Sequence, residues 1–154
     1  MAVYFVDSSA LVKRYINETG SAWVLNLFDP ALNNEVLIAA ITSVEIVAAV
    51  TRRARGGSIS VVNATLICNQ FKNDQVSEYQ VLEITDNVIN SAMVLAETYG
   101  LRGYDAVQLA VGCTVNTLCE VNSLPSVIFV SADDELNKVA VREGLIVENP
   151  NRYP

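Results

Sequence analysis

The chain of 154 residues contains no histidine and only three cysteines. Without histidine it cannot build a Ser-His-Asp or Cys-His catalytic centre, or bind zinc through imidazole. The three cysteines form no Cys-x-x-Cys pair, which argues against an all-cysteine zinc site. They also favour reduced thiols, as in a cytoplasmic protein, over a disulfide framework. Acid–base or metal chemistry would therefore depend on the 17 carboxylates.

Long apolar runs and basic residues are also scarce. Apolar stretches such as residues 36–41 are far shorter than the ~20 residues of a membrane span. The first residues show no export signal, so we expect a cytoplasmic protein with no membrane association. A net charge of −7 argues against a broad nucleic-acid-binding surface, but it allows a local basic strip beside an acidic site.

Hydrophobic residues make up 51% of the chain, which is enough for one well-packed domain. Short apolar segments alternate with helix-forming segments, and this pattern is typical of an α/β protein with a mainly parallel sheet. We therefore expect a three-layer α/β/α sandwich, with a single domain over residues 1–148 and a C-terminal tail over 149–154. The predicted strands are residues 3–6, 37–41, 79–84, 127–130 and 145–147.

Acidic residues stand where predicted strands give way to helices. Each has a purely structural alternative. Asp7 can cap the helix that follows it, and Asp105 suits the positive end of a helix dipole. Glu45 ends a Thr-Ser-Val-Glu capping-box pattern that would begin a helix at residue 42. Asp134 could form a similar box with the serine at 131, next to Asp133.

The common position of these acids favours a functional site. The carboxyl ends of parallel strands meet at one edge of a sheet, so Asp7, Glu45 and Asp133 should converge there, and Asp105 joins them if its helix enters at that edge. Carboxylates that close repel one another unless a cation lies between them. Oxygen ligands favour Mg²⁺ or Mn²⁺. Such a site suits metal-assisted attack of water on a phosphodiester.

Four segments, in this order, resemble PIN-domain ribonucleases and more closely the VapC-type toxins of bacterial toxin–antitoxin pairs. They are Val-Asp-Ser-Ser-Ala-Leu-Val-Lys at 6–13, Ser-Val-Glu-Ile at 43–46, Leu-Arg-Gly-Tyr-Asp-Ala-Val-Gln-Leu-Ala at 101–110 and Val-Ser-Ala-Asp at 130–133. The resemblance implies a PIN-like fold and an endoribonuclease that uses one or two Mg²⁺ or Mn²⁺ ions. It also implies an RNA substrate, an antitoxin partner and a homodimer.

The resemblance also assigns roles to individual residues. The family's catalytic metal ligands match Asp7, Glu45, Asp105 and Asp133. Its supporting hydroxyls match Ser9 and Ser131, and Asp134 is a substitute candidate for its neighbour Asp133.

Lys13 and Arg14 are the predicted substrate-binding residues, because they lie near Asp7 along the chain, and they could equally bind acidic residues of a partner. Arg102, just before Asp105, is a third candidate. The arginines at 52, 53 and 55 end a helix, so we expect them to lie away from the site. Two other functions stay open: a catalytically silent PIN-like binding or regulatory domain, and a phosphoryl-transfer domain of the HAD or receiver type. The second fits poorly, because Ser9 and Asp133 replace the Asp and Lys that those families need.

Overall fold

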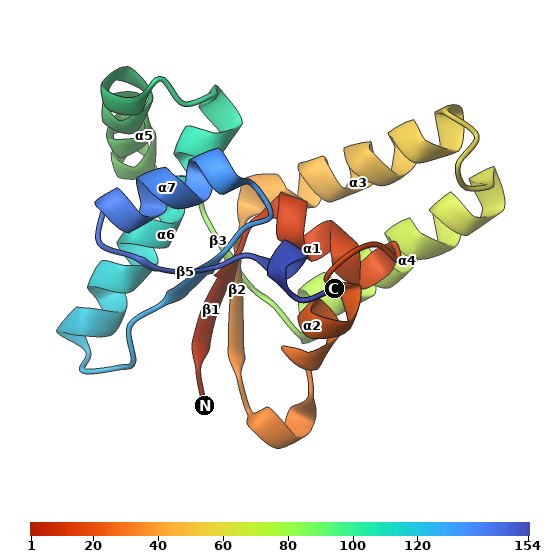
Figure 1. Ribbon diagram of the computed structural model, residues 1–154, viewed down its shortest axis with the longest axis horizontal. Helices are drawn as coiled ribbons and strands as arrows, with labels where there is room; N and C mark the ends of the chain where they lie inside the picture. Colours follow the sequence, from red (N-terminus) through yellow and green to blue (C-terminus); the bar gives the residue numbers. More distant parts are fainter.

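The computed structural model describes all 154 residues and has a five-stranded, fully parallel sheet at its centre (Figure 1). The strand order is β3-β2-β1-β4-β5, so the first strand lies in the middle. Each strand lies at or within a few residues of an apolar segment that predicted it. Their bounds are β1 Val3–Val6, β2 Glu35–Ala39, β3 Gln80–Leu82, β4 Ile128–Val130 and β5 Ile146–Glu148.

Helices cover both faces of the sheet, which confirms the expected three-layer α/β/α architecture. One face carries α1 Ser8–Tyr15, α2 Ser21–Asn26, α3 Ala40–Arg55 and α4 Val61–Ser77. The other carries α5 Asp86–Tyr99, α6 Gly103–Val121 and α7 Asp134–Arg142. Two short 3-10 turns complete the chain, at Pro30–Leu32 and Pro150–Arg152. None of the helices is both long and apolar enough to cross a membrane.

The sheet packs closely against α6. Phe5 of β1 and Phe129 of β4 are fully buried and stack with their ring centroids 5.6 Å apart. Gly112 of α6 lies directly over this pair, where a Cβ atom would come within 2.8 Å of the Phe129 ring. Glycine therefore allows the helix to approach the sheet closely at this point.

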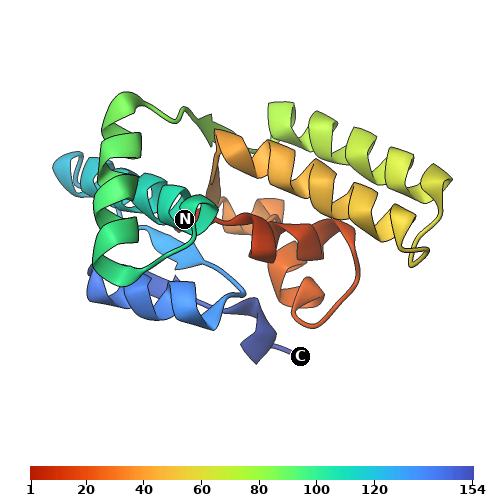
Figure 2. The ribbon, with the colours of Figure 1, turned by 90° about the horizontal axis from the view of Figure 1, so that it is seen from above.

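The helices α3 and α4 form an antiparallel pair that projects beyond the sheet (Figure 2). The helix α3 begins at Ala40, two residues before the start expected from the capping-box pattern. Its N-cap residue, Ala39, has no side chain that could cap it. The capping-box interpretation of residues 42–45 is therefore wrong, and Glu45 lies in the second turn, free of any capping role.

The last six residues fold back onto α2. The ring of Tyr153 stacks on Trp23 with centroids 5.0 Å apart and ring planes 5° from parallel. Asn149 is almost fully buried and its amide donates to Asp134 Oδ1 at 2.8 Å. Gly20 adopts φ +86°, and a side chain there would collide with the backbone of Pro150. The expected tail is thus packed against the domain.

Candidate functional site

A cavity of about 480 Å³ opens at the carboxyl edge of the sheet. It lies beside β1, which pairs with β2 on one side and β4 on the other. The strand order reverses at β1, and α/β proteins commonly bind ligands in the crevice at such a topological switch point. The four acids predicted from the sequence all line this cavity: Asp7, Glu45, Asp105 and Asp133. The fold therefore brings together residues that are up to 126 positions apart, counting from 7 to 133.

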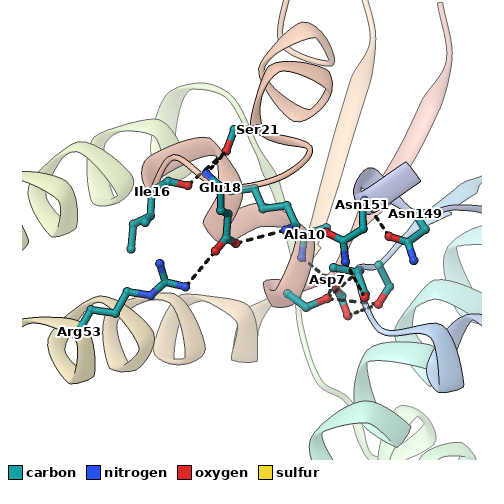
Figure 3. A network of polar contacts seen from close by, with 12 residues as sticks. Asp7, Ala10, Ile16, Glu18, Ser21, Arg53, Asn149 and Asn151 are labelled. Atoms are coloured by element: carbon teal, nitrogen blue, oxygen red, sulfur yellow. Dashed lines mark hydrogen bonds and ion pairs between the residues drawn. The ribbon is translucent and has the colours of Figure 1, made fainter. Parts of the chain in front are cut away.

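Asp7 follows β1 directly and is held in place by three hydrogen bonds (Figure 3). Its Oδ1 accepts the Ser9 hydroxyl at 2.7 Å and the Ala10 amide at 3.1 Å, and its Oδ2 accepts the Ser131 hydroxyl at 2.8 Å. Asp7 therefore caps α1 and also lines the cavity, so its capping role is compatible with the predicted functional role.

The environment of Asp7 disfavours its charge. The side chain is 3% exposed, and burial raises the pKa of Asp7 from its usual 3.8 to about 6. The three hydrogen bonds lower the pKa, and the negative charge of Glu45 raises it further. At neutral pH the cavity thus contains a buried carboxylate that a nearby cation would stabilise.

Ser9 and Ser131 connect the ends of β1 and β4. Their hydroxyl oxygens are 3.3 Å apart, and each also accepts a backbone amide from the loop after β4. Those amides belong to Ala132 and Asp133. The two serines therefore fix both the orientation of Asp7 and the path of the chain into α7.

Glu45 has a partner that the sequence analysis did not single out. Gln108 of α6 is 1% exposed, and its Nε2 donates to Glu45 Oε1 and to Thr42 Oγ1, both at 2.8 Å. Its own Oε1 has no hydrogen-bond partner. A signal was present, because this polar residue lies one turn beyond Asp105 within the otherwise apolar segment 106–113.

Asp105 and Asp133 share one cation, the guanidinium of Arg102. Its Nε lies 3.1 Å from Asp105 Oδ2, and its Nη2 lies 3.5 Å from Asp133 Oδ2. The Arg102 side chain is 81% exposed, so the pair of contacts lies at the mouth of the cavity. The other oxygen of Asp133 caps α7 by accepting the amides of Glu135 and Leu136. Asp134 does not line the cavity, and it accepts a hydrogen bond from Asn149 instead.

The donor set suits a hard divalent cation, although the acids do not meet at one point. No group of three or more carboxylates or thiols is arranged to hold a metal ion as the side chains stand. Two of the four carboxylates pair with Arg102, whose guanidinium supplies the positive charge beside them. All four side chains offer carboxylate oxygens, which suit Mg²⁺ and Mn²⁺. Together with the raised pKa of Asp7, this composition fits a cation that replaces the Arg102 contacts.

The structure does not bring the two predicted substrate-binding residues to the cavity. Lys13 is 6% exposed and pairs with Glu18 at 3.3 Å. Arg14 lies 3.8 Å over the Phe28 ring and donates to Glu78 at 2.6 Å. Both residues lie about two turns along α1 from Asp7, which carries them ~9–10 Å away from the sheet edge.

Arg52 lines the cavity, so the expectation that it would lie away from the site is wrong. It follows Glu45 by seven residues, close to two helical turns, so both side chains occur on the same face of α3. Its neighbour Arg53 points elsewhere and pairs with Glu18 at 3.2 Å, as Figure 3 shows.

No protein-family model and no curated protein matches the sequence. Solved structures do match the fold over nearly the whole chain. A chain of a toxin–antitoxin complex from Klebsiella pneumoniae is 15% identical, with a TM-score of 0.59 and coverage of 96% of this chain and 97% of that chain. A chain of FitAcB from Neisseria gonorrhoeae is 13% identical, with a TM-score of 0.64 and coverage of 96% and 97%.

A third match is VapBC2 from Rickettsia felis, solved bound to a DNA fragment from the promoter of its own genes. Its matching chain is 16% identical, with a TM-score of 0.63 and coverage of 96% of this chain and 98% of that chain. At such low identity the likeness concerns the fold alone. The α/β fold expected from the sequence is thus shared with these solved structures over nearly the whole chain.

Proposed function

We propose that the chain is a metal-dependent endoribonuclease that cleaves RNA at the carboxylate-lined cavity. One observation carries the proposal: four acids from four separate parts of the chain line a single cavity at the carboxyl edge of the sheet. Only two of these acids pair with a basic residue, and that residue is the exposed Arg102. A cluster of this kind costs folding free energy, as the raised pKa of Asp7 indicates, and a bound cation offsets that cost.

The acids would hold one or two Mg²⁺ or Mn²⁺ ions: Asp7, Glu45, Asp105 and Asp133. When bound, such an ion lowers the pKa of water and stabilises charge on the leaving oxygen of a phosphodiester. Ser9 and Ser131 hold Asp7 in one orientation, and Gln108 does the same for Glu45. Arg102 lies at the cavity mouth, where it can exchange a carboxylate for a phosphate oxygen.

We further propose that the chain is the toxin of a toxin–antitoxin pair, and that it forms a homodimer in the cytoplasm. An antitoxin partner is supported by the similar chain from Klebsiella pneumoniae, which was solved within a toxin–antitoxin complex. The three thiols are unpaired, as a reducing compartment favours. Light scattering on the purified chain tests the dimer, and a monomer mass would contradict it.

The test of cleavage compares the wild type with Asp105→Asn on a pool of structured RNA, with Mg²⁺, with Mn²⁺ and with EDTA. Asp105 is partly exposed in the first turn of α6, so the substitution should leave the fold intact. We expect the wild type to cleave only with metal and the variant to lose cleavage. Equal cleavage by both proteins would contradict the proposal. A folded wild type that binds metal but cuts nothing would favour the catalytically silent alternative.

A further inference from the structure

We propose that single-stranded RNA reaches the cavity along the outer face of α3, and that Arg52, Arg55 and Lys72 bind its phosphates. This inference rests on the proposed ribonuclease function and names the residues that hold its substrate. It replaces the predicted pair Lys13 and Arg14, which the structure directs into other contacts.

The surface between the carboxylate-lined cavity and α4 is continuous. A hollow of about 520 Å³ on the outer face of α3 shares Val44, Ala48 and Arg52 with the carboxylate-lined cavity. A third hollow, of about 340 Å³ between α3 and α4, shares Arg55 with the second and extends to Lys72. Because neighbouring hollows share lining residues, they form one path from the acids along α3 to the space between α3 and α4. This helix pair projects beyond the sheet in Figure 2.

Positive charge is concentrated in the segment that forms α3 and α4. Residues 46–73 contain four basic residues and no acidic residue, a charge of +4, so the remainder of the chain carries −7 − 4 = −11. An RNA strand is repelled by most of such a surface, and it is attracted to this segment. Local attraction of this kind is needed in a protein whose overall charge is negative.

The basic side chains along this path have no acidic partner within the protein. Arg52, Arg55 and Lys72 are exposed, and none of them pairs with a carboxylate. Arg53 lies between the two arginines in sequence but points away to Glu18. Counted from Glu45 at 1.5 Å per residue, Arg52 and Arg55 lie about 10 and 15 Å along the helix axis. Cations at successive distances from the cavity suit successive phosphates of one strand.

The floor of the path also suits a single strand. It consists of small and apolar side chains, including Val44, which is 69% exposed, and Ala48. Small and aliphatic side chains leave room for unpaired bases and give them an apolar surface, while the flanking basic residues contact the backbone, as in grooves that track a single strand. A substrate strand must continue beyond the bond that is cut, and the free cations lie in that direction. An acidic protein segment would share the cations but would gain nothing from reaching a cavity of four carboxylates.

The test measures binding of a short fluorescent single-stranded oligoribonucleotide of mixed sequence by anisotropy, in EDTA so that no cleavage occurs. The wild type is compared with Arg52→Ala/Arg55→Ala and with Lys72→Ala. Arg142→Ala is the matched control, because Arg142 is exposed and unpaired on α7, outside the path. All four side chains are on the surface, so the folds should be unchanged.

We expect the double variant to bind on the order of tenfold more weakly at moderate salt, with the slope of log K against log salt reduced by about 1.4, or ~0.7 per lost contact. The Lys72 variant should lose about half as much slope, and the Arg142 control should match the wild type. Unchanged binding by the double variant overturns the proposal. The proposal is also overturned if the binding of polyglutamate, and not the binding of RNA, depends on the two arginines.

A second measurement separates this proposal from the ribonuclease function. With Mg²⁺, the double variant should show a raised KM for RNA cleavage and a nearly unchanged kcat, because it retains the four carboxylates. Metal-dependent cleavage whose KM does not depend on the arginines overturns the RNA path and leaves the nuclease standing. RNA binding that depends on the arginines, without cleavage by the wild type, supports the path and contradicts the nuclease.

Discussion

Replacing Asp7 by asparagine should stabilise the folded protein at neutral pH. The carboxylate is 3% exposed and burial raises its pKa from 3.8 to about 6. This difference of about 2 pK units corresponds to about 3 kcal/mol of unfavourable charge burial. Asparagine removes the charge but retains the shape, and its amide can still bond to Ser9, Ala10 and Ser131. Allowing about 1 kcal/mol for altered hydrogen bonds leaves a gain of about 2 kcal/mol.

The sign of the pH dependence follows from the raised pKa. The folded state binds the Asp7 proton more tightly than the unfolded state does, so the wild type is most stable below about pH 4. The contribution of this proton to the free energy of unfolding decreases as the pH rises from about 4 to about 6, and it is absent above that range. The Asp7→Asn variant has no titrating group at this position. The difference in free energy of unfolding between the variant and the wild type should therefore grow over the same pH range.

Urea unfolding in EDTA, at intervals between pH 4 and pH 7, measures this gap. We expect similar free energies of unfolding at pH 4 and a value about 2 kcal/mol higher for the variant at pH 7. Added Mg²⁺ should stabilise the wild type and reduce the difference, because it offsets the buried charge. A variant that is less stable than the wild type at pH 7, or a gap independent of pH, would refute the reasoning.

Three further predictions concern other parts of the structure. Gly112→Ala should cost about 1–3 kcal/mol of stability in urea unfolding, because its Cβ would meet the Phe129 ring; an unchanged midpoint would refute that packing argument. Gln108→Met should weaken Mg²⁺ binding about tenfold in calorimetry, since Glu45 loses its hydrogen bond, and unchanged affinity would show that the amide does not position the ligand. Arg102→Ala should change stability by less than about 1 kcal/mol and strengthen Mg²⁺ binding several-fold, because a competing cation is removed; weaker metal binding would contradict this.

The strands and helices could be predicted because they follow short apolar segments separated by polar ones. The boundary between β2 and α3 could not, since neither Ala39 nor Ala40 carries a capping side chain that marks a helix start. The gathering of the four acids could also be predicted from the rule that strand ends meet at one edge of a parallel sheet. Their role in catalysis stays a prediction.

The basic residues show the limit of reasoning from nearness along the chain. Arg14 is close to Asp7 in sequence, yet two turns of α1 carry it to a separate cluster with Tyr79 and Glu78. Arg52 lies in the last turn of α3, which we expected to lead away from the site, yet helical periodicity puts it on the same face as Glu45. Both outcomes depend on which way a helix face turns, and this is set by packing between elements distant in sequence.

The most direct test of the proposed ribonuclease compares Asp133→Asn with Asp134→Asn. The two acids are adjacent in sequence, but Asp133 lines the cavity and Asp134 bonds to Asn149. Asparagine is as good a helix cap as aspartate, so Asp133→Asn should retain the fold of α7. Cleavage of RNA with Mg²⁺ should fall at least about tenfold in Asp133→Asn and stay near the wild-type rate in Asp134→Asn. Equal rates in the two variants, or a loss confined to Asp134→Asn, would contradict the assignment of the cavity as the active site.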